Sequence, residues 1–266
     1  MAVTIKTSAF VKKLASNDRK TRDHAFETLK KYLSKKDSKL TYLEYQKLWK
    51  GLYYTMWFSD RPRPQQRLAK DISSLFTCIS TTSNFTLFVK SFWDIICKEW
   101  PELDQWRIDK FYMLMRFIIN SCFEKLKLEN WDNDLVNNYI NILIDGVLSG
   151  DRKIPVGVVY HIIDVWIDEL EKVMFKDIDD DDDEEDDEEE TDSLNDEKKS
   201  IVADIPIDLL LKPFKNLRKN ALLKTLRLKT RDDLLLDSRL QDWGIDTGEV
   251  KPKKEEEEEW TGFGDN

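Results

Sequence analysis

Histidine is the side chain most often used for proton transfer near neutral pH, and this chain contains only His24 and His161. His24 falls early in a predicted helix, beside lysines and arginines. His161 falls within a later predicted helix, near Asp164 and Asp168. Neither has a nucleophile at a recognisable motif spacing, so the pattern does not match a Ser-His-Asp or Cys-His arrangement. We interpret both as surface or hydrogen-bonded interior side chains.

Metal and cofactor chemistry is not indicated either. Cys78, Cys97 and Cys122 lie in apolar helical stretches without paired spacing, which is typical of reduced cysteines in an intracellular protein. The 12 consecutive acids at 179–190 would bind divalent cations only loosely, because a catalytic metal needs carboxylates held by folded elements. No glycine-rich phosphate loop occurs. We expect no enzyme, no catalytic residues, no metal, no cofactor and no small-molecule substrate.

The charge is distributed very unevenly along the chain. The formal net charge is -10, but residues 177–197 alone contribute 16 acids and no bases. Without that run and the acidic segment 251–266, the remaining body carries a net charge of +9. A folded region this basic attracts polyanions through its long-range potential and through counterion release. Ordinary solvated lysines are the equally weighted alternative.

Basic side chains concentrate in the first 70 residues, at predicted helix ends and corners. If neighbouring corners lie side by side, they form one basic ridge that contacts RNA through phosphates and bases. The alternative is a solvated face, with lysines that complement helix C-termini. The candidate RNA- or partner-binding residues of this set are Lys30, Lys31, Lys35, Lys36, Lys47, Lys50, Arg61, Arg63 and Arg67.

A second basic set lies in the C-terminal part of the chain. Lys212, Lys215 and Lys219 share one helical face, opposite a leucine-rich face. The apolar face would dock onto a partner or onto the chain's own helices, and internal packing is at least as well supported. Further on, Trp260 and Phe263 lie among acids and glycines, as in a short partner-docking motif. Their position there is equally compatible with no role.

These side chains are positioned by consecutive amphipathic helices. Apolar residues recur at helical spacing from Ser8 to Phe175, and prolines and short polar segments separate the helices. The predicted helices cover approximately 10–14, 18–33, 42–57, 64–79, 85–100, 106–123, 131–147 and 155–173, of which 106–123 is the most central. We predict an all-α fold of stacked antiparallel helical pairs, a HEAT/armadillo-like α-solenoid. A globular helical bundle is the alternative, because no strict repeat period is visible.

The same patterns predict the domain organisation. Residues 1–176 form the helical-repeat domain, and 177–200 form an acidic disordered linker whose charges repel one another. Residues 201–245 resume helical patterning as a C-terminal helical arm, and 246–266 form an acidic extended tail. No apolar run approaches the roughly 18 residues that cross a bilayer, so no membrane contact is expected.

One long segment resembles a known family. Residues 47–69 read KLWKGLYYTMWFSDRPRPQQRLA, and the likeness extends over roughly residues 5–175. The segment closely resembles that of the nucleolar family named for ribosomal RNA processing protein 1. The resemblance implies a nuclear, nucleolar, non-catalytic assembly factor of pre-60S particles. Such a factor is required for large-subunit pre-rRNA processing around the internal transcribed spacers, and it acts as a protein- and RNA-binding scaffold.

The resemblance also implies partners: the pre-60S particle, other assembly factors of the WD-repeat and Brix-domain classes, and pre-rRNA. The family carries no catalytic residues over to this sequence. Two other function classes stay open at this point. The acidic run at 179–190 is compatible with a chaperone or adaptor for a basic nuclear client. A metal-dependent nuclease acting on pre-rRNA is the least supported.

Overall fold

The computed structural model describes residues 7–14, 16, 18–38, 40–179 and 197–250. In these ranges every regular element is a helix, and no strand occurs. Among the same residues, no helix is long and apolar enough to cross a membrane. The predicted acidic linker and acidic tail fall mostly outside the described residues, so the proposed division into domains stays a prediction.

The N-terminal helices begin at side-chain caps that the sequence supplies. α1 (Thr7–Leu14) precedes α2 (Arg19–Leu33), whose first turn is capped where Asp18 accepts a hydrogen bond from the Thr21 N–H. α3 (Tyr42–Trp57) starts with a reciprocal capping box between Thr41 and Glu44. These contacts satisfy N–H groups that have no partner inside the helix. α1 packs against both α2 and α3.

The centre of the molecule is α7 (Ile108–Leu128), which contacts α4 (Pro62–Ser73), α5 (Leu75–Cys78) and α9 (Val156–Met174). The predicted central position of this helix is therefore confirmed. α6 (Thr82–Glu99) packs against α3 and against α8 (Asn133–Asp145). Two single turns, η1 (Trp100–Glu102) and α10 (Lys176–Asp179), extend α6 and α9.

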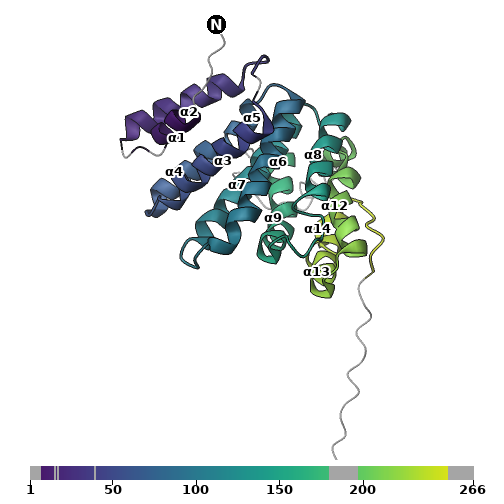
Figure 1. Ribbon diagram of the computed structural model, residues 1–266. Helices are drawn as coiled ribbons and strands as arrows, with labels where there is room; N and C mark the ends of the chain where they lie inside the picture. The colour runs from purple at the N-terminus through teal and green to yellow at the C-terminus, as the bar shows by residue number, and fades with distance from the viewer. Residues whose placement is uncertain (1–6, 15, 17, 39, 180–196, 251–266) are drawn as a thin grey trace, which may run out of the picture.

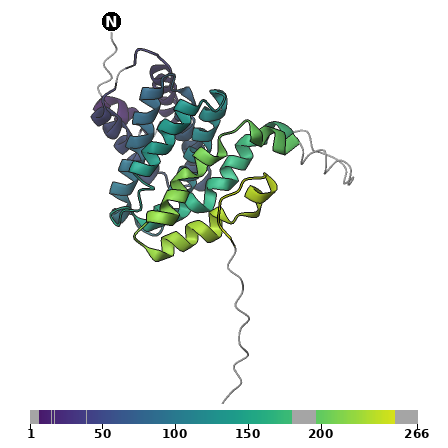
Figure 2. The ribbon, with the colours of Figure 1, turned by 90° about the vertical axis from the view of Figure 1, so that its right-hand side faces the viewer.

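The C-terminal helices complete the stack. They are α12 (Ile207–Asn220), α13 (Lys224–Lys229), the π-helical turn η2 (Thr230–Leu235) and α14 (Ser238–Asp242). α12 packs on α8, and α13 and η2 pack on α9. Figure 1 shows the helices following one another from α1 and α2 at one end to α12–α14 at the other, and Figure 2 shows the C-terminal helices lying across one face. The all-α, solenoid-like architecture is confirmed.

Large aromatic side chains fill the interior. Trp49 lies against Phe76, Phe88 and Phe92, with ring centroids 4.7–5.7 Å apart, and its indole Nε1 donates to the Phe88 carbonyl at 3.0 Å. The indole is therefore buried with its polar atom satisfied, which is usual for a buried tryptophan. A second cluster centres on Trp166 and joins α7, α9 and α12.

Two tryptophans differ from their predicted places. Trp106, expected at the start of the central helix, precedes α7 and is 85% exposed, because Asp104 forms a local turn by accepting from the Trp106 N–H and pairing with Arg107. Trp131, expected inside a helix, precedes α8 with φ at +53°, next to Asn130 at +51°. It is buried nonetheless, so the apolar pattern identified a core residue but misplaced the helix start.

Candidate interaction surface

The two histidines have structural surroundings. His161 of α9 stacks on the Tyr112 ring with centroids 4.4 Å apart, and its Nε2 lies 2.8 Å from the Tyr112 carbonyl oxygen. Burial lowers the pKa of His161. His24 is exposed on α2. Both positions fall within the sequence-based interpretation, which allowed a surface or a hydrogen-bonded interior place for each histidine.

The cysteines are all free thiols, with Cys122 buried and the other two partly buried. Burial raises the pKa of Cys97 to about 12, which keeps that thiol protonated and unreactive. Within the described part of the chain, no group of three or more histidine, cysteine or acidic side chains is arranged to hold a metal ion.

The first lysine cluster lies at the C-terminal end of α2. Lys31, Lys35 and Lys36 are exposed, and Lys30 is partly buried, 3.8 Å from Glu27. Lysines in this position complement the negative end of the helix dipole. Lys47 and Lys50 are exposed on α3, where Lys50 pairs with Glu99 at 3.2 Å. Some of these charges thus have a partner within the fold.

Two arginines of the proline corner, Arg61 and Arg67, line a cleft of about 750 Å³ between the start of α2 and the α3–α4 connection. We call this the arginine cleft. Its walls are Ser16, Arg22, Asp23, Phe26, Thr55, Phe58, Ser59, Asp60, Arg61, Pro64, Arg67, Leu68 and Asp71. Arg61 and Arg67 face it from α4 and its N-cap, whereas Arg63, also exposed, is not part of its lining.

A buried lysine fixes the corner that carries these arginines. Lys110 of α7 is 5% exposed and donates to the carbonyl oxygens of Trp57 at 2.6 Å and Ser59 at 2.8 Å. These contacts satisfy carbonyls at the end of α3, which have no partner inside the helix. Gln65 also donates to the Ser59 carbonyl, at 2.7 Å. Burial lowers the pKa of Lys110. The connection from α3 to α4 is therefore held from both sides.

The structure separates the two N-terminal basic clusters. Arg22, near the start of α2, lines the cleft together with Arg61. Lys31 is nine residues further along α2, which is roughly 13 Å at the helical rise per residue. The lysines therefore lie at the C-terminal end of α2, and this helix contacts α5. Along α2 itself, the cleft-lining Arg22 and the lysine cluster therefore lie at opposite ends of the helix.

The second basic set borders a smaller groove of about 480 Å³. Lys215, Arg218, Lys219 and Arg227 line it, together with Glu249. Arg218 pairs with Glu249 at 2.9 Å, and Lys215 pairs with Asp208 at 2.8 Å. Lys212 is exposed. The chain's own carboxylates thus occupy part of this groove.

The leucine-rich face opposite these lysines packs inside the protein. Leu210, Leu211 and Leu217 are completely buried, and Phe214 meets the Trp166 ring edge-on at 4.9 Å. Of the two possibilities that the sequence left open for this face, docking onto the chain's own helices is the one observed.

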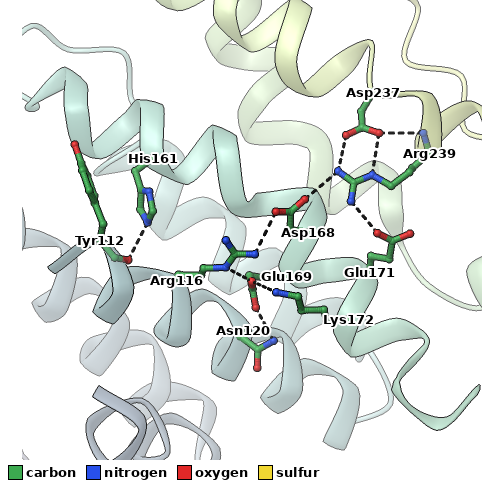
Figure 3. A network of polar contacts seen from close by, with 10 residues as sticks. All are labelled: Tyr112, Arg116, Asn120, His161, Asp168, Glu169, Glu171, Lys172, Asp237 and Arg239. Carbon is green, nitrogen blue, oxygen red and sulfur yellow. Dashed lines mark hydrogen bonds and ion pairs between the residues drawn. The ribbon is translucent and has the colours of Figure 1, made fainter. Parts of the chain in front are cut away.

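Ion pairs also join the C-terminal helices to the stack (Figure 3). Arg239 of α14 donates to Asp168 at 3.1 Å and to Glu171 at 2.7 Å, both on α9. Asp168 in turn accepts from Arg116 of α7 at 3.2 Å. Because three helices share one carboxylate, this network fixes α14 against the central helices.

A nearly buried acid extends the same network. Glu169 pairs with Arg116, accepts from Asn120 at 2.9 Å and pairs with Lys172 at 2.7 Å. Three donors compensate the desolvation of its carboxylate, as buried charges require. Asp168 and Glu169 therefore serve the packing of α7, α9 and α14.

The candidate docking residues Trp260 and Phe263 lie outside the described residues, so their role stays a prediction.

The structure also adds residues to the candidate site that the sequence analysis did not single out as binding residues: Arg22, Phe58 and Asp71. Phe58 had a signal in the sequence, since this aromatic follows directly after the apolar stripe over 42–57, and the structure shows it to be 71% exposed. Asp71 lies on α4 itself, four residues after Arg67, whereas Arg22 is distant in sequence and is brought to the cleft by the position of α2.

Fold and surface define a class: a stack of helices whose candidate site is a set of charged surface clusters rather than a constellation of catalytic groups. The chain belongs to the family described as "Nucleolar protein, Nop52", which matches residues 5–262. This confirms the family resemblance carried by residues 47–69, and it confirms a nucleolar location.

Named relatives agree with the family. The chain is 36% identical to human ribosomal RNA processing protein 1 homolog B over 173 residues, covering 64% of this chain and 23% of the human protein. Human homolog A is also 36% identical, with 60% and 36% covered, and the Caenorhabditis elegans homolog is 30% identical, with 61% and 41% covered. The chain thus spans well under two thirds of the length of these relatives.

Proposed function

We propose that this chain is a ribosome-biogenesis factor, a non-catalytic scaffold of nucleolar pre-60S particles that is required for large-subunit pre-rRNA processing around the internal transcribed spacers. The family and the names of its relatives support the ribosomal RNA setting. The observation on this chain that carries the proposal is the arginine-rich corner of α4. There Arg61, Arg63 and Arg67 are exposed and form no side-chain hydrogen bond or ion pair with any described residue.

Unpaired arginines on a rigid corner suit contact with a polyanion. A guanidinium forks onto phosphate oxygens and also stacks on bases, and it keeps its charge at every physiological pH. Holding the corner with Lys110 and Gln65 lowers the ordering cost of binding, because the backbone does not have to be fixed on contact. The pre-rRNA of a nucleolar particle supplies such a polyanion.

A scaffold role also explains why the polar network of the interior is structural. Asp168 and Glu169 are paired with Arg116, Lys172 and Arg239, and none of these pairs needs a substrate to be complete. As partners we propose the pre-60S particle and assembly factors of the WD-repeat and Brix-domain classes. Protein contacts would use the exposed helix faces, and RNA contact the basic clusters.

Depletion followed by complementation tests the proposal. Depleting the protein should block large-subunit pre-rRNA maturation while sparing the small subunit, measured by hybridisation to precursors and by gradient sedimentation. Complementation with the Arg61→Glu, Arg63→Glu, Arg67→Glu variant should restore neither particle association nor processing. A charge reversal of exposed Arg152 and Lys153, in the loop before α9, is the matched control and should complement.

Normal large-subunit precursors after depletion would refute the proposal.

Deleting residues 179–190 provides a separate test of the chaperone alternative. Loss of binding to a basic client, with particle association unchanged, would favour that alternative. Unchanged growth and particle association, with no client lost, would exclude it.

A further inference from the structure

The arginine cleft presents charges of both signs that do not neutralise one another. Arg61 and Arg67 line it together with Asp60 and Asp71. Among the described residues, none of these four side chains makes a hydrogen bond or an ion pair. Charged groups left without partners around a cavity favour a ligand that brings both anionic groups and hydrogen-bond donors.

Asp71 is the clearest case of an incompletely satisfied group. It is partly buried in the last turns of α4, and burial raises the pKa of its carboxyl. Lys30 and Arg67 act in the opposite direction, without forming a pair with it. A donor from a ligand would satisfy this carboxylate.

An aromatic surface lies at the same cleft. Phe58 is 71% exposed, and its ring stacks on that of Tyr54 with centroids 6.3 Å apart and an interplanar angle of 29°. Tyr54 is itself 37% exposed. An exposed, supported ring is the kind of platform on which unpaired nucleic-acid bases stack.

The start of α4 restricts how an anion would be held. Pro62 and Pro64 occupy the first turn and have no N–H, so the backbone offers few donors at this helix end. Anion binding here must therefore rest on the side chains of Arg61 and Arg67. Because two guanidiniums line the cleft, each can pair with a phosphate of the same extended strand.

We propose that the arginine cleft binds an unpaired nucleotide of single-stranded RNA. The base stacks on Phe58, and the flanking phosphates pair with Arg61 and Arg67. Amino groups on the base edge donate to the carboxylates of Asp60 and Asp71, which as ionised groups only accept hydrogen bonds. The cleft volume of about 750 Å³ is within the range of small-molecule sites and exceeds the needs of one base. This deepens the proposed RNA contact and rests on it.

The carboxylates give the site a base preference. Cytosine carries an exocyclic amino group, whereas uracil offers an oxygen at the same position. Two carboxylates repel that oxygen and accept from the amino group, so oligo(C) should bind more tightly than oligo(U). The two pyrimidines are similar in size, which leaves the amino group as the main difference between these probes.

The test uses the purified full chain and fluorescently labelled eight-nucleotide oligo(C) and oligo(U), with binding measured by anisotropy over a range of salt concentrations. Phe58→Ala should weaken oligo(C) binding about tenfold, the effect expected for one lost base–aromatic stack. Arg67→Ala should lower the slope of log affinity against log salt by about 0.7, the value for one phosphate contact on a single strand. Asp60→Asn with Asp71→Asn should remove the preference for oligo(C) over oligo(U).

Arg152→Ala is the matched control, because Arg152 is exposed in the loop before α9 and does not line the cleft. It should leave the oligo(C) preference unchanged. Equal affinity of the wild type, Phe58→Ala and Arg67→Ala for oligo(C) would overturn the inference. So would the absence of oligonucleotide binding, including the case in which a peptide of an assembly factor occupies the cleft. In that case the pre-rRNA phenotype of depletion would persist, so the proposed function would survive the failure of this inference.

Discussion

The guanidinium of Arg239 donates through Nη2 to the carboxylate of Asp168 at 3.1 Å, and this contact joins α14 to α9 across 71 residues of sequence. The same guanidinium contacts Glu171 at 2.7 Å and Asp237 at 2.7 Å. A single planar side chain therefore closes the C-terminal end of the stack, and its five donors make this possible.

Arg239→Gln should loosen the C-terminal helices without unfolding the rest. Its ion pairs are about one-third exposed, so we expect a loss of only about 1–2 kcal/mol in the free energy of unfolding. Hydrogen–deuterium exchange should rise in α14 and η2 and stay unchanged in α3 and α6. Arg231→Gln is the control, since Arg231 pairs only with its neighbour Asp232 and should have no measurable effect. If hydrogen–deuterium exchange in α14 and η2 were the same in Arg239→Gln as in the wild type, the role assigned to Arg239 would be contradicted.

Trp49→Ala should destabilise the chain by about 3–5 kcal/mol, because it leaves a cavity among Phe76, Phe88 and Phe92. Urea unfolding followed by circular dichroism measures the change. Trp106→Ala removes an indole that is 85% exposed and should change stability by less than about 0.5 kcal/mol. Comparable losses in both variants would show that side-chain size, rather than burial, determines the effect.

Lys110→Met should destabilise the α3–α4 corner by about 2–3 kcal/mol. Methionine retains much of the apolar stem but leaves the carbonyls of Trp57 and Ser59 without their donor. Lys98→Met replaces an exposed lysine on α6 and is the control. Thermal unfolding of both variants measures the difference. A stability of Lys110→Met equal to that of the control would show that the corner does not depend on this lysine.

His161 should make stability fall on mild acidification. Burial lowers its pKa in the folded state below the ordinary value of 6.5, so the unfolded chain binds the extra proton first as the pH falls. This contribution to stability is complete above pH 6.5 and is lost progressively as the pH falls towards the folded-state pKa. Asp71, whose pKa is raised, acts in the opposite direction at lower pH.

The His161 contribution is isolated by comparing the wild type with His161→Phe, which keeps an aromatic ring over Tyr112. Melting temperatures between pH 7.5 and 5 should fall more steeply in the wild type. His24→Phe, on the exposed face of α2, should retain the wild-type slope. Parallel slopes in the wild type and His161→Phe would exclude the buried histidine as the cause.

The helices could be predicted from the sequence, because apolar periodicity depends on residues three or four positions apart. The apolar stripe over 42–57 and the proline corner both correspond to observed elements, α3 and the start of α4. The predicted start of the central helix was wrong at Trp106, since the competing turn around Asp104 depends on side-chain hydrogen bonds that periodicity does not detect.

What the sequence determined by itself is the helical class, the family and the chemical character of the proline corner, all of which are local in the chain. Only the tertiary structure decided what faces that corner. Arg22 lines the same cleft as Phe58 because α2 lies beside the α3–α4 connection. Lys110 reaches the end of α3 because α7 lies against that helix, where Phe111 stacks on Tyr53. Such pairings depend on how whole helix faces fit together, since the burial of apolar area is non-directional and does not specify which helix is the partner.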